Sequence, residues 1–160
     1  MRHWLSLPRN CVFLMIKIIA VGKKHDTDLT HAISSYQKRL KVPFDVDWVF
    51  LPNSPRTLEQ ARQSESEAIM KRLLPDNFVI LLDERGDLLT SELFSGELQN
   101  QNIVVIIGGA YGVTDELRRR ADSVVSLSKM VFPHQLVRLV LIEQIYRAQT
   151  IISGHPYHHT

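Results

Sequence analysis

The stretch SLSKMVFPHQLVRLVLIEQIYR, residues 126–147, decides the fold, because a polar loop is followed directly by the most apolar helix-forming segment of the chain. Pro133 suits the first turn of a helix, where its missing N–H is not needed, and it pushes Phe132 toward extended geometry. We therefore expect a helix that begins near Pro133. Apolar side chains cover most of its circumference, so it needs apolar neighbours on two sides. We expect the chain's own sheet on one side and a second copy of the protein on the other.

The length and composition fit a single domain, and the single cysteine is compatible with a reducing compartment. The chain has 160 residues and a net charge of +2, and a domain of this length buries about 70% of its unfolded surface. Cys11 is the one cysteine in the sequence, which excludes an intramolecular disulfide and a multi-cysteine zinc site. No apolar run approaches the roughly 18 residues of a membrane span. We expect a cytoplasmic protein, and the small positive charge permits a nucleic-acid partner without arguing for one.

The first fourteen residues, MRHWLSLPRNCVFL, differ in pattern from the rest of the chain. A signal peptide needs an unbroken apolar segment and a small-residue cleavage site, but residues 8–10 interrupt the former and the latter is not evident. The segment MIKIIAVGK, which begins at Met15, is typical of the first strand of an α/β domain. We therefore predict that residues 1–14 form an N-terminal extension outside the fold and that residues 15–160 form one domain.

Apolar runs alternate with helix-forming segments along the rest of the chain. Runs of β-branched residues that end at glycine, proline or polar residues predict strands, and apolar side chains three and four residues apart predict helices. Such alternation favours an α/β fold with a mostly parallel sheet. The predicted strands are 16–21, 44–51, 78–82, 103–107 and 123–127, with a turn through Gly86 at 83–87; the predicted helices begin at Asp26 or Thr27, span 58–74, follow Thr90 to between 96 and 100, and run from Thr114 or Asp115 to Arg120. The helix at 58–74 carries so many charges that we expect it to be the most exposed.

Three strand ends are informative, because ligands of parallel α/β sheets bind outside the carboxyl ends of the strands. They are Leu82 with Asp83, the sequence GGAYG at 108–112, and the loop at 127–132. Glycines after a buried strand let the backbone approach a ligand or take a positive φ. GGAYG lacks the GxGxxG spacing and the later acidic residue of a dinucleotide site. By itself it fits a tight turn without a ligand equally well.

The tail GHPYHHT, residues 154–160, holds three histidines without a carboxylate or cysteine beside them, so we expect no metal site. A disordered terminus is the common state of such a segment. Tyr157 and His158 have a second interpretation, because an aromatic ring can stack on a base and an imidazole can accept a proton near neutral pH.

The arginines of the C-terminal half differ in what they indicate. Arg138 lies on the apolar helix, and a buried arginine needs a carboxylate or phosphate partner. Arg147 has a local partner in Glu143, four residues earlier. The three arginines at 118–120 point in different directions around their helix, which is typical of a solvated surface.

Taken together, residues 15–160 resemble the RlmH family, the 23S ribosomal RNA pseudouridine N3-methyltransferases of the SPOUT, or α/β-knot, class. The matching segments are IKIIAVGK, SSYQKRL, ILLDERG, IIGGAYG, SLSKMVFPHQLVRLVLIEQIYRA and HPYH. The long block with the PYH tail is the most specific of these. The first fourteen residues have no counterpart, and residues 92–103 look shortened between helix and strand.

The resemblance implies a mostly parallel sheet of five to six strands, flanked by helices, whose C-terminal part is threaded as a deep trefoil knot, an arrangement that general topology rules make rare. It also implies a homodimer and S-adenosyl-L-methionine as the cofactor. These implied cofactor positions coincide with the three strand ends. They are Leu82, Gly108, Leu127, Ser128, Lys129, Met130, Val131 and Phe132.

The reaction implied by the resemblance is direct methyl transfer from the cofactor's sulfonium to N3 of a pseudouridine in 23S ribosomal RNA. That nitrogen must lose a proton, so the protein contributes positioning and a base or acceptor. The candidates are Tyr157 and His158, for base contact or proton removal, and Arg138, for phosphate or base positioning. The residues do not decide which of them is the base.

With no appended RNA-binding module and a net charge of +2, we expect RNA to be recognised on an assembled ribosome, with both subunits of the dimer contributing. Two alternatives stay open at this stage. One is a knotted methyltransferase with another RNA substrate, such as tRNA. The other is a non-catalytic α/β domain that binds an adenine nucleotide.

Overall fold

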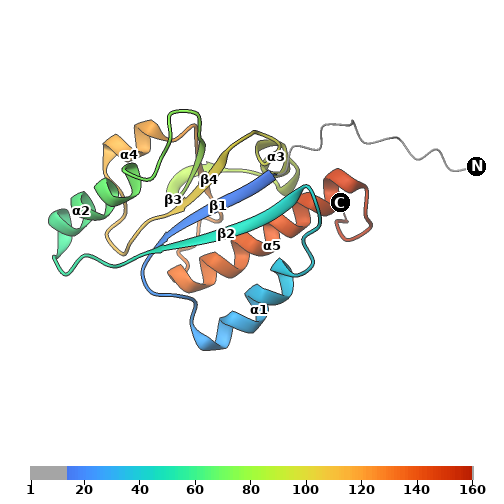
Figure 1. The fold of residues 1–160 in the computed structure, drawn as a ribbon, viewed down its shortest axis with the longest axis horizontal. Helices are drawn as coiled ribbons and strands as arrows, with labels where there is room; N and C mark the ends of the chain where they lie inside the picture. Colours follow the sequence, from blue (N-terminus) through green and yellow to red (C-terminus); the bar gives the residue numbers. More distant parts are fainter. Residues whose placement is uncertain (1–13, 160) are drawn as a thin grey trace, which may run out of the picture.

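The computed structural model describes residues 14–159, and within them five strands form one parallel sheet (Figure 1). The strand order is β2-β1-β4-β3-β5, and each neighbouring pair is parallel. This confirms the predicted α/β class and mostly parallel sheet, while the trefoil knot stays a prediction. The strands are β1 (Leu14–Val21), β2 (Phe44–Leu51), β3 (Phe78–Leu88), β4 (Ile103–Ile107) and β5 (Ser123–Ser126).

Helices cover both faces of the sheet. On one face lie α1 (Thr27–Gln37), α3 (Ser91–Glu97) and α5 (His134–Ser153), and on the other lie α2 (Leu58–Met70) and α4 (Asp115–Arg120). Side chains of β1 alternate between the two cores, with Ile18 packed on the α5 side and Ile19 on the α2 side. Burial on both faces explains why β4 is apolar at all five positions.

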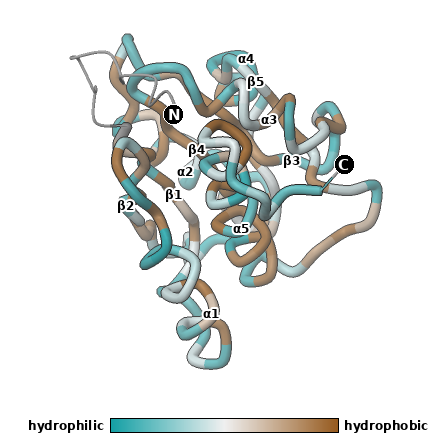
Figure 2. Tube along the Cα trace, turned by 90° about the vertical axis from the view of Figure 1, so that its right-hand side faces the viewer, coloured by the Kyte–Doolittle hydropathy of each residue, from teal (hydrophilic) through white to brown (hydrophobic). Residues whose placement is uncertain are grey.

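Helix α5 begins at His134, one residue after Pro133, and ends where Gly154 adopts a left-handed conformation at φ 67°. It packs against the sheet, and α1 and α3 lie on either side of it. In Figure 2 the apolar stretches of α5 lie toward the middle of the molecule, beside the strands, whereas α1 lies at the edge. The chain therefore supplies more of the helix's apolar neighbours than the sequence led us to expect. Leu136 and Ile152 remain 37% and 43% exposed, and the second copy stays a prediction.

The predicted end of the strand at Leu82 is wrong, because β3 includes residues 83–87 and continues to Leu88. Leu82 and Asp87 of β3 both pair with Val125 of β5, so the residues between them bulge out of the ladder where the turn was predicted. Gly86 lies so close to β5 that a Cβ at this position would stand 2.6 Å from the carbonyl oxygen of Val124. Glycine is required here by the close approach of two backbones and not by a turn.

The remaining elements differ little from expectation. Thr90 and Thr114 cap α3 and α4 as predicted, each accepting a hydrogen bond from the backbone three residues later. Helix α2 ends at Met70, and Leu58, expected on its apolar side, is 68% exposed with φ 51°. Leu14 already belongs to β1; the rest of the predicted extension lies outside the described residues. Among these, no helix combines the length and apolarity needed to cross a membrane.

The contact at Gly86 makes a stability prediction. Gly86→Ala should lower the free energy of unfolding by about 1–3 kcal/mol, because the new methyl group forces the two strands apart. Gly96→Ala is the matched control: it lies in α3, and a Cβ at this position would meet no atom within 4 Å, so it should raise stability by about 0.5–1 kcal/mol. Urea unfolding measures both values, and equal effects of the two variants would contradict the assigned contact.

Candidate functional site

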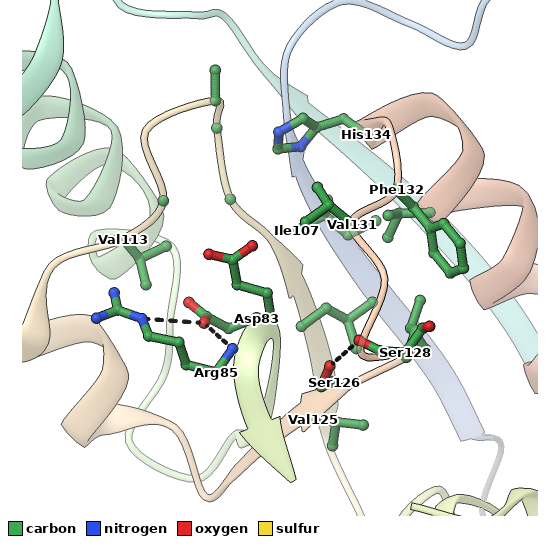
Figure 3. Close-up of a pocket in the computed structure, with 18 of the residues that line it drawn as sticks. Asp83, Arg85, Ile107, Val113, Val125, Ser126, Ser128, Val131, Phe132 and His134 are labelled. Atoms are coloured by element: carbon green, nitrogen blue, oxygen red, sulfur yellow. Dashed lines mark hydrogen bonds and ion pairs between the residues drawn. The ribbon is translucent and has the colours of Figure 1, made fainter. Parts of the chain in front are cut away.

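The bulge of β3 that follows Leu82 and the carboxyl ends of β4 and β5 open into one cavity of about 410 Å³ (Figure 3). This volume lies in the range of about 300–1,000 Å³ that is usual for small-molecule sites. The wall consists of residues 82–85 of β3, residues 107–113, residues 125–128 and 130–132, the first turn of α5, and Arg62 of α2. Seven of the eight implied cofactor positions line it, namely Leu82, Gly108, Leu127, Ser128, Met130, Val131 and Phe132; Lys129 does not. Their role in cofactor binding stays a prediction.

Residues 108–114, which we call the glycine loop, form the side of the cavity that follows β4. The N–H of Gly112 donates to the carbonyl oxygen of Gly109 at 3.1 Å, and Gly112 has φ 75°. A Cβ on Gly108 would stand 2.9 Å from Cγ1 of Val113. The tight turn that GGAYG suggested is therefore present, and it also provides a wall of backbone to the cavity.

The loop at residues 127–132 faces the end of β3 across the cavity, as Figure 3 shows for Ser128, Val131 and Phe132 opposite Asp83 and Arg85. Ser126 Oγ donates to the carbonyl oxygen of Ser128 at 2.8 Å, and Ser128 Oγ accepts from the N–H of Met130 at 2.9 Å. These bonds fix the loop without an acidic side chain. Met130 and Val131 are 74% and 79% exposed, so the loop presents backbone groups and apolar side chains to a ligand.

Asp83 supplies a fixed negative charge to the cavity wall. Its carboxylate lies 2.9 Å from Nη2 of Arg118 and accepts from the N–H of Arg85 at 2.8 Å. Burial by itself raises the pKa of Asp83, but the interactions with Arg118 and Arg85 together outweigh burial and hold the pKa below its ordinary value. Asp83 is therefore ionised at neutral pH.

The prediction of a solvated surface at residues 118–120 is wrong for two of the three arginines. Arg118 pairs with Asp83, and Arg120 donates to the carbonyl oxygens of Leu74 and Asn77 at 2.9 and 3.1 Å. Their helix is only six residues long and packs against the sheet, so directions around an isolated helix did not show which side chains reach a partner. His134 lines the cavity and was not predicted from the sequence. The signal that could have identified it is its position directly after Pro133, at the start of a helix that follows a predicted ligand loop.

The described part of the tail packs along α5. The predicted pair of Arg147 and Glu143 is confirmed at 2.6 Å, and Tyr157 Oη donates to the same carboxylate at 3.1 Å. His158 lies 3.2 Å from Arg147 through Nδ1 and 2.6 Å from Glu92 through Nε2. Gly154, His155, Tyr157 and His158 therefore have defined contacts, which does not fit the alternative of a disordered terminus. None of the tail residues that the structure describes, 154–159, lines the cavity of its own chain.

These contacts also shift the pKa values of Glu92, in α3, and of Tyr157, in the tail. The hydrogen bond with His158 is the largest of the effects that lower the pKa of Glu92 to about 2. Burial, together with the neighbouring Tyr36 and Glu143, raises the pKa of Tyr157. In this arrangement Tyr157 is protonated at neutral pH and donates a hydrogen bond, so it is not poised to accept a proton.

Arg138 is almost fully buried, as predicted, but its partners are backbone carbonyls and not a carboxylate or phosphate. Nη1 donates to Lys23 at 2.8 Å and Nη2 donates to Val21 at 3.4 Å, and the guanidinium lies 5.2 Å from the ring centroid of Phe50. Arg138 therefore joins the end of β1 to α5 and does not line the cavity. Its role toward RNA stays a prediction. Residues 14–159 hold no cluster of three or more His, Cys, Asp or Glu suited to a metal ion.

The ionised state of Asp83 predicts a pH dependence of stability. A carboxyl whose pKa is lower in the folded than in the unfolded chain stabilises the fold above its unfolded pKa, near 4, and loses that contribution as pH falls through the folded pKa. The free energy of unfolding should therefore drop less between pH 7 and pH 3 in Asp83→Asn than in the wild type. Asp115→Asn is the control, since Asp115 is 81% exposed and 3.9 Å from the same arginine. Urea unfolding at both pH values tests this, and an unchanged drop in Asp83→Asn would contradict it.

Known proteins resemble the chain over nearly its whole length. The model of the family described as "Predicted SPOUT methyltransferase" matches residues 14–158. Three relatives carry the name "Ribosomal RNA large subunit methyltransferase H". The one from Christiangramia forsetii is 38% identical over 156 residues, which are 91% of this chain and 99% of that protein. That from Geobacter metallireducens is 40% identical over 154 residues, 92% and 100% of the two chains. The protein from Desulforamulus reducens is 39% identical over 158 residues, 91% and 99% of the two chains.

Proposed function

The chain belongs to the SPOUT methyltransferase family, and from this we propose that it methylates N3 of a pseudouridine in 23S ribosomal RNA with S-adenosyl-L-methionine as the methyl donor. The observation that carries the proposal is the convergence of three strand ends on one cavity that seven of the implied cofactor positions line. Support for the RNA substrate comes from relatives that are named large-subunit ribosomal RNA methyltransferases and that align with 91–92% of this chain.

The volume of the cavity and several of the groups that line it support S-adenosyl-L-methionine as its ligand. Cβ atoms on Gly108 and Gly109 would crowd neighbouring side chains, so the glycine loop keeps a bare backbone surface that a ligand can approach closely. The carboxylate of Asp83 complements a cationic ligand, and the apolar side chains of Met130 and Val131 can cover its less polar parts. When bound there, the cofactor supplies the methyl group.

A protein group must take the proton from the acceptor nitrogen. The described part of the tail carries the candidates, but it does not reach the cavity of its own chain. Tyr157 contacts Glu143, which lies six residues beyond Val137, the last residue of α5 that lines the cavity, and so about 9 Å further along the helix axis. In our proposal a second copy brings its Tyr157 and His158 over this cavity. The exposed Met130, Val131 and Leu136 beside the cavity mouth provide apolar surface for that copy to cover.

The first prediction concerns binding and catalysis. Calorimetry should show saturable binding of S-adenosyl-L-methionine by the wild type, and Gly108→Val should weaken it by about tenfold or more, because the side chain meets Val113 and enters the cavity. Purified protein should methylate ribosomes from a strain that lacks the gene, as read by mass spectrometry of 23S RNA. Gly96→Ala serves as the control with wild-type values.

Three outcomes separate the alternatives. Binding without methylation of any RNA would favour the non-catalytic domain. Methylation of tRNA in place of ribosomes, with affinity that falls steeply as salt rises, would favour the free-RNA enzyme. Absence of binding by the wild type would overturn the proposed cofactor. We expect activity on ribosomes, and hence a cytoplasmic location.

A second prediction concerns the two-copy site. Deletion of residues 157–160 should leave cofactor binding nearly intact and reduce methylation by about 10²–10⁴, the usual contribution of proton transfer. Co-expression of the deletion with Gly108→Val should restore about a quarter of wild-type activity, because in a two-fold symmetric pair each mixed dimer keeps one intact cavity facing one intact tail.

The oligomeric state provides the control. Light scattering should report about twice the chain mass of 18.4 kDa for each variant. If the tail acted on the cavity of its own chain, no mixed dimer would hold a complete site and activity would not return. A stable monomer would likewise contradict the two-copy site.

A further inference from the structure

Helix α2, which the sequence predicted to be the most exposed, packs against the glycine loop, and its Arg62 also lines the cavity. Arg62 Nε donates to the carbonyl oxygen of Tyr111 at 2.9 Å, and Ser66 Oγ accepts from the N–H of Thr114 at 3.0 Å. Between them on the same face of α2 lies Glu65, and both Glu65 and Ser66 are buried. One face of α2 therefore contacts the loop at its middle and at its end.

Glu65 is an unusual member of this face, because its carboxylate is buried with one hydrogen bond. Oε1 accepts from the N–H of Ser54 at 2.8 Å, whereas Oε2 is buried without a hydrogen-bond partner among the described residues. Oε2 occupies the place where a Cβ of Gly109 would stand. The carboxylate therefore packs against the bare backbone of the glycine loop and also holds the loop between β2 and α2.

A buried carboxylate with a bare oxygen is costly for stability, and an apolar side chain of similar size would serve a purely structural role better. Glu65 is not among the cavity-lining residues, so it does not touch a ligand there. The described residues provide no group of ligands around it that would hold a metal. What its contacts do define is the position of Gly109.

We infer that Glu65 is a positioning residue of the cofactor site. Its carboxylate packs on Gly109 and accepts a hydrogen bond from Ser54. It thereby fixes the distance between the glycine loop and α2, and with it the shape of the cavity. The glycine at position 109 is the complementary half of the same contact. The expected effect on cofactor affinity rests on the proposed function, whereas the effect on loop order does not.

Hydrogen exchange of the ligand-free protein tests the positioning role directly. In Glu65→Ala the amides of Gly109, Gly112 and Thr114 should exchange about tenfold faster or more, because the loop loses its support, while amides of β1 and β4 keep their protection.

Glu67→Ala is the matched control, since Glu67 is exposed on the same helix and its carboxylate accepts from Gln63. Glu65→Gln keeps the acceptor for Ser54 and the shape, so it should remain close to wild type and provides the test if Glu65→Ala does not fold. Equal loop exchange in Glu65→Ala and Glu67→Ala, or loop exchange in Glu65→Gln as fast as in an unsupported loop, would overturn the inference.

A double-mutant cycle tests the pairing of Glu65 with Gly109. Gly109→Ala alone should raise the dissociation constant for S-adenosyl-L-methionine by about tenfold or more, because the methyl group displaces the carboxylate or the loop. In the Glu65→Ala background the carboxylate is gone and Cγ1 of Val21, at 3.2 Å from the new Cβ, is the remaining close neighbour, so the added penalty should fall below about threefold. Equal penalties in both backgrounds would refute the pairing. If the wild type bound no cofactor, the proposed function would fail, and the exchange experiment would still decide the role of Glu65.

Discussion

The parallel direction of all five strands is the constraint on which the rest of the structure depends. Each strand must be followed by a return across one face of the sheet, so helices bury both faces and the central strands become apolar throughout. The same direction brings the carboxyl ends of β3, β4 and β5 to one edge. The buried strands carry apolar side chains, whereas polar groups and exposed backbone lie at this edge, and the cavity forms there.

Close backbone contacts then give the cavity its shape. At Gly86 the end of β3 lies against β5, and at Gly109 the loop after β4 lies against a carboxylate of α2. Neither site tolerates a Cβ at the observed spacing, although neither glycine has a positive φ. The pair of Asp83 and Arg118 fixes a charge between these contacts and joins the end of β3 to α4. Groups outside the cavity, such as Glu65 and Arg118, therefore support its wall without lining it.

Local signals predicted local features well. The caps at Thr90 and Thr114 and the bounds of β2 and β4 follow from residues within a few positions of each other. The bulge at Gly86 depends on β5, nearly forty residues later, and the burial of Glu65 depends on loops at Ser54 and Gly109, so no local pattern could show either. The cofactor positions came from the family resemblance and coincide with strand ends that the α/β pattern indicated independently. The threading of the chain has no local signature at all.

Helix α5 links the two halves of the proposed reaction. Its first turn lines the cavity, and its later turns hold the tail through Glu143 and Arg147. Because the helix is rigid, the tail and the cavity of one chain stay apart. In the proposed dimer the two-fold axis places the tail of each chain near the cavity of the other. The contacts that raise the pKa of Tyr157 must then change before it could accept a proton, because burial and its neighbours favour the neutral phenol. Without such a change, Tyr157 is suited to orienting the target base by hydrogen bonding or stacking. His158 must likewise leave Arg147 or Glu92, which lie against its two ring nitrogens, before it can take a proton from the target base.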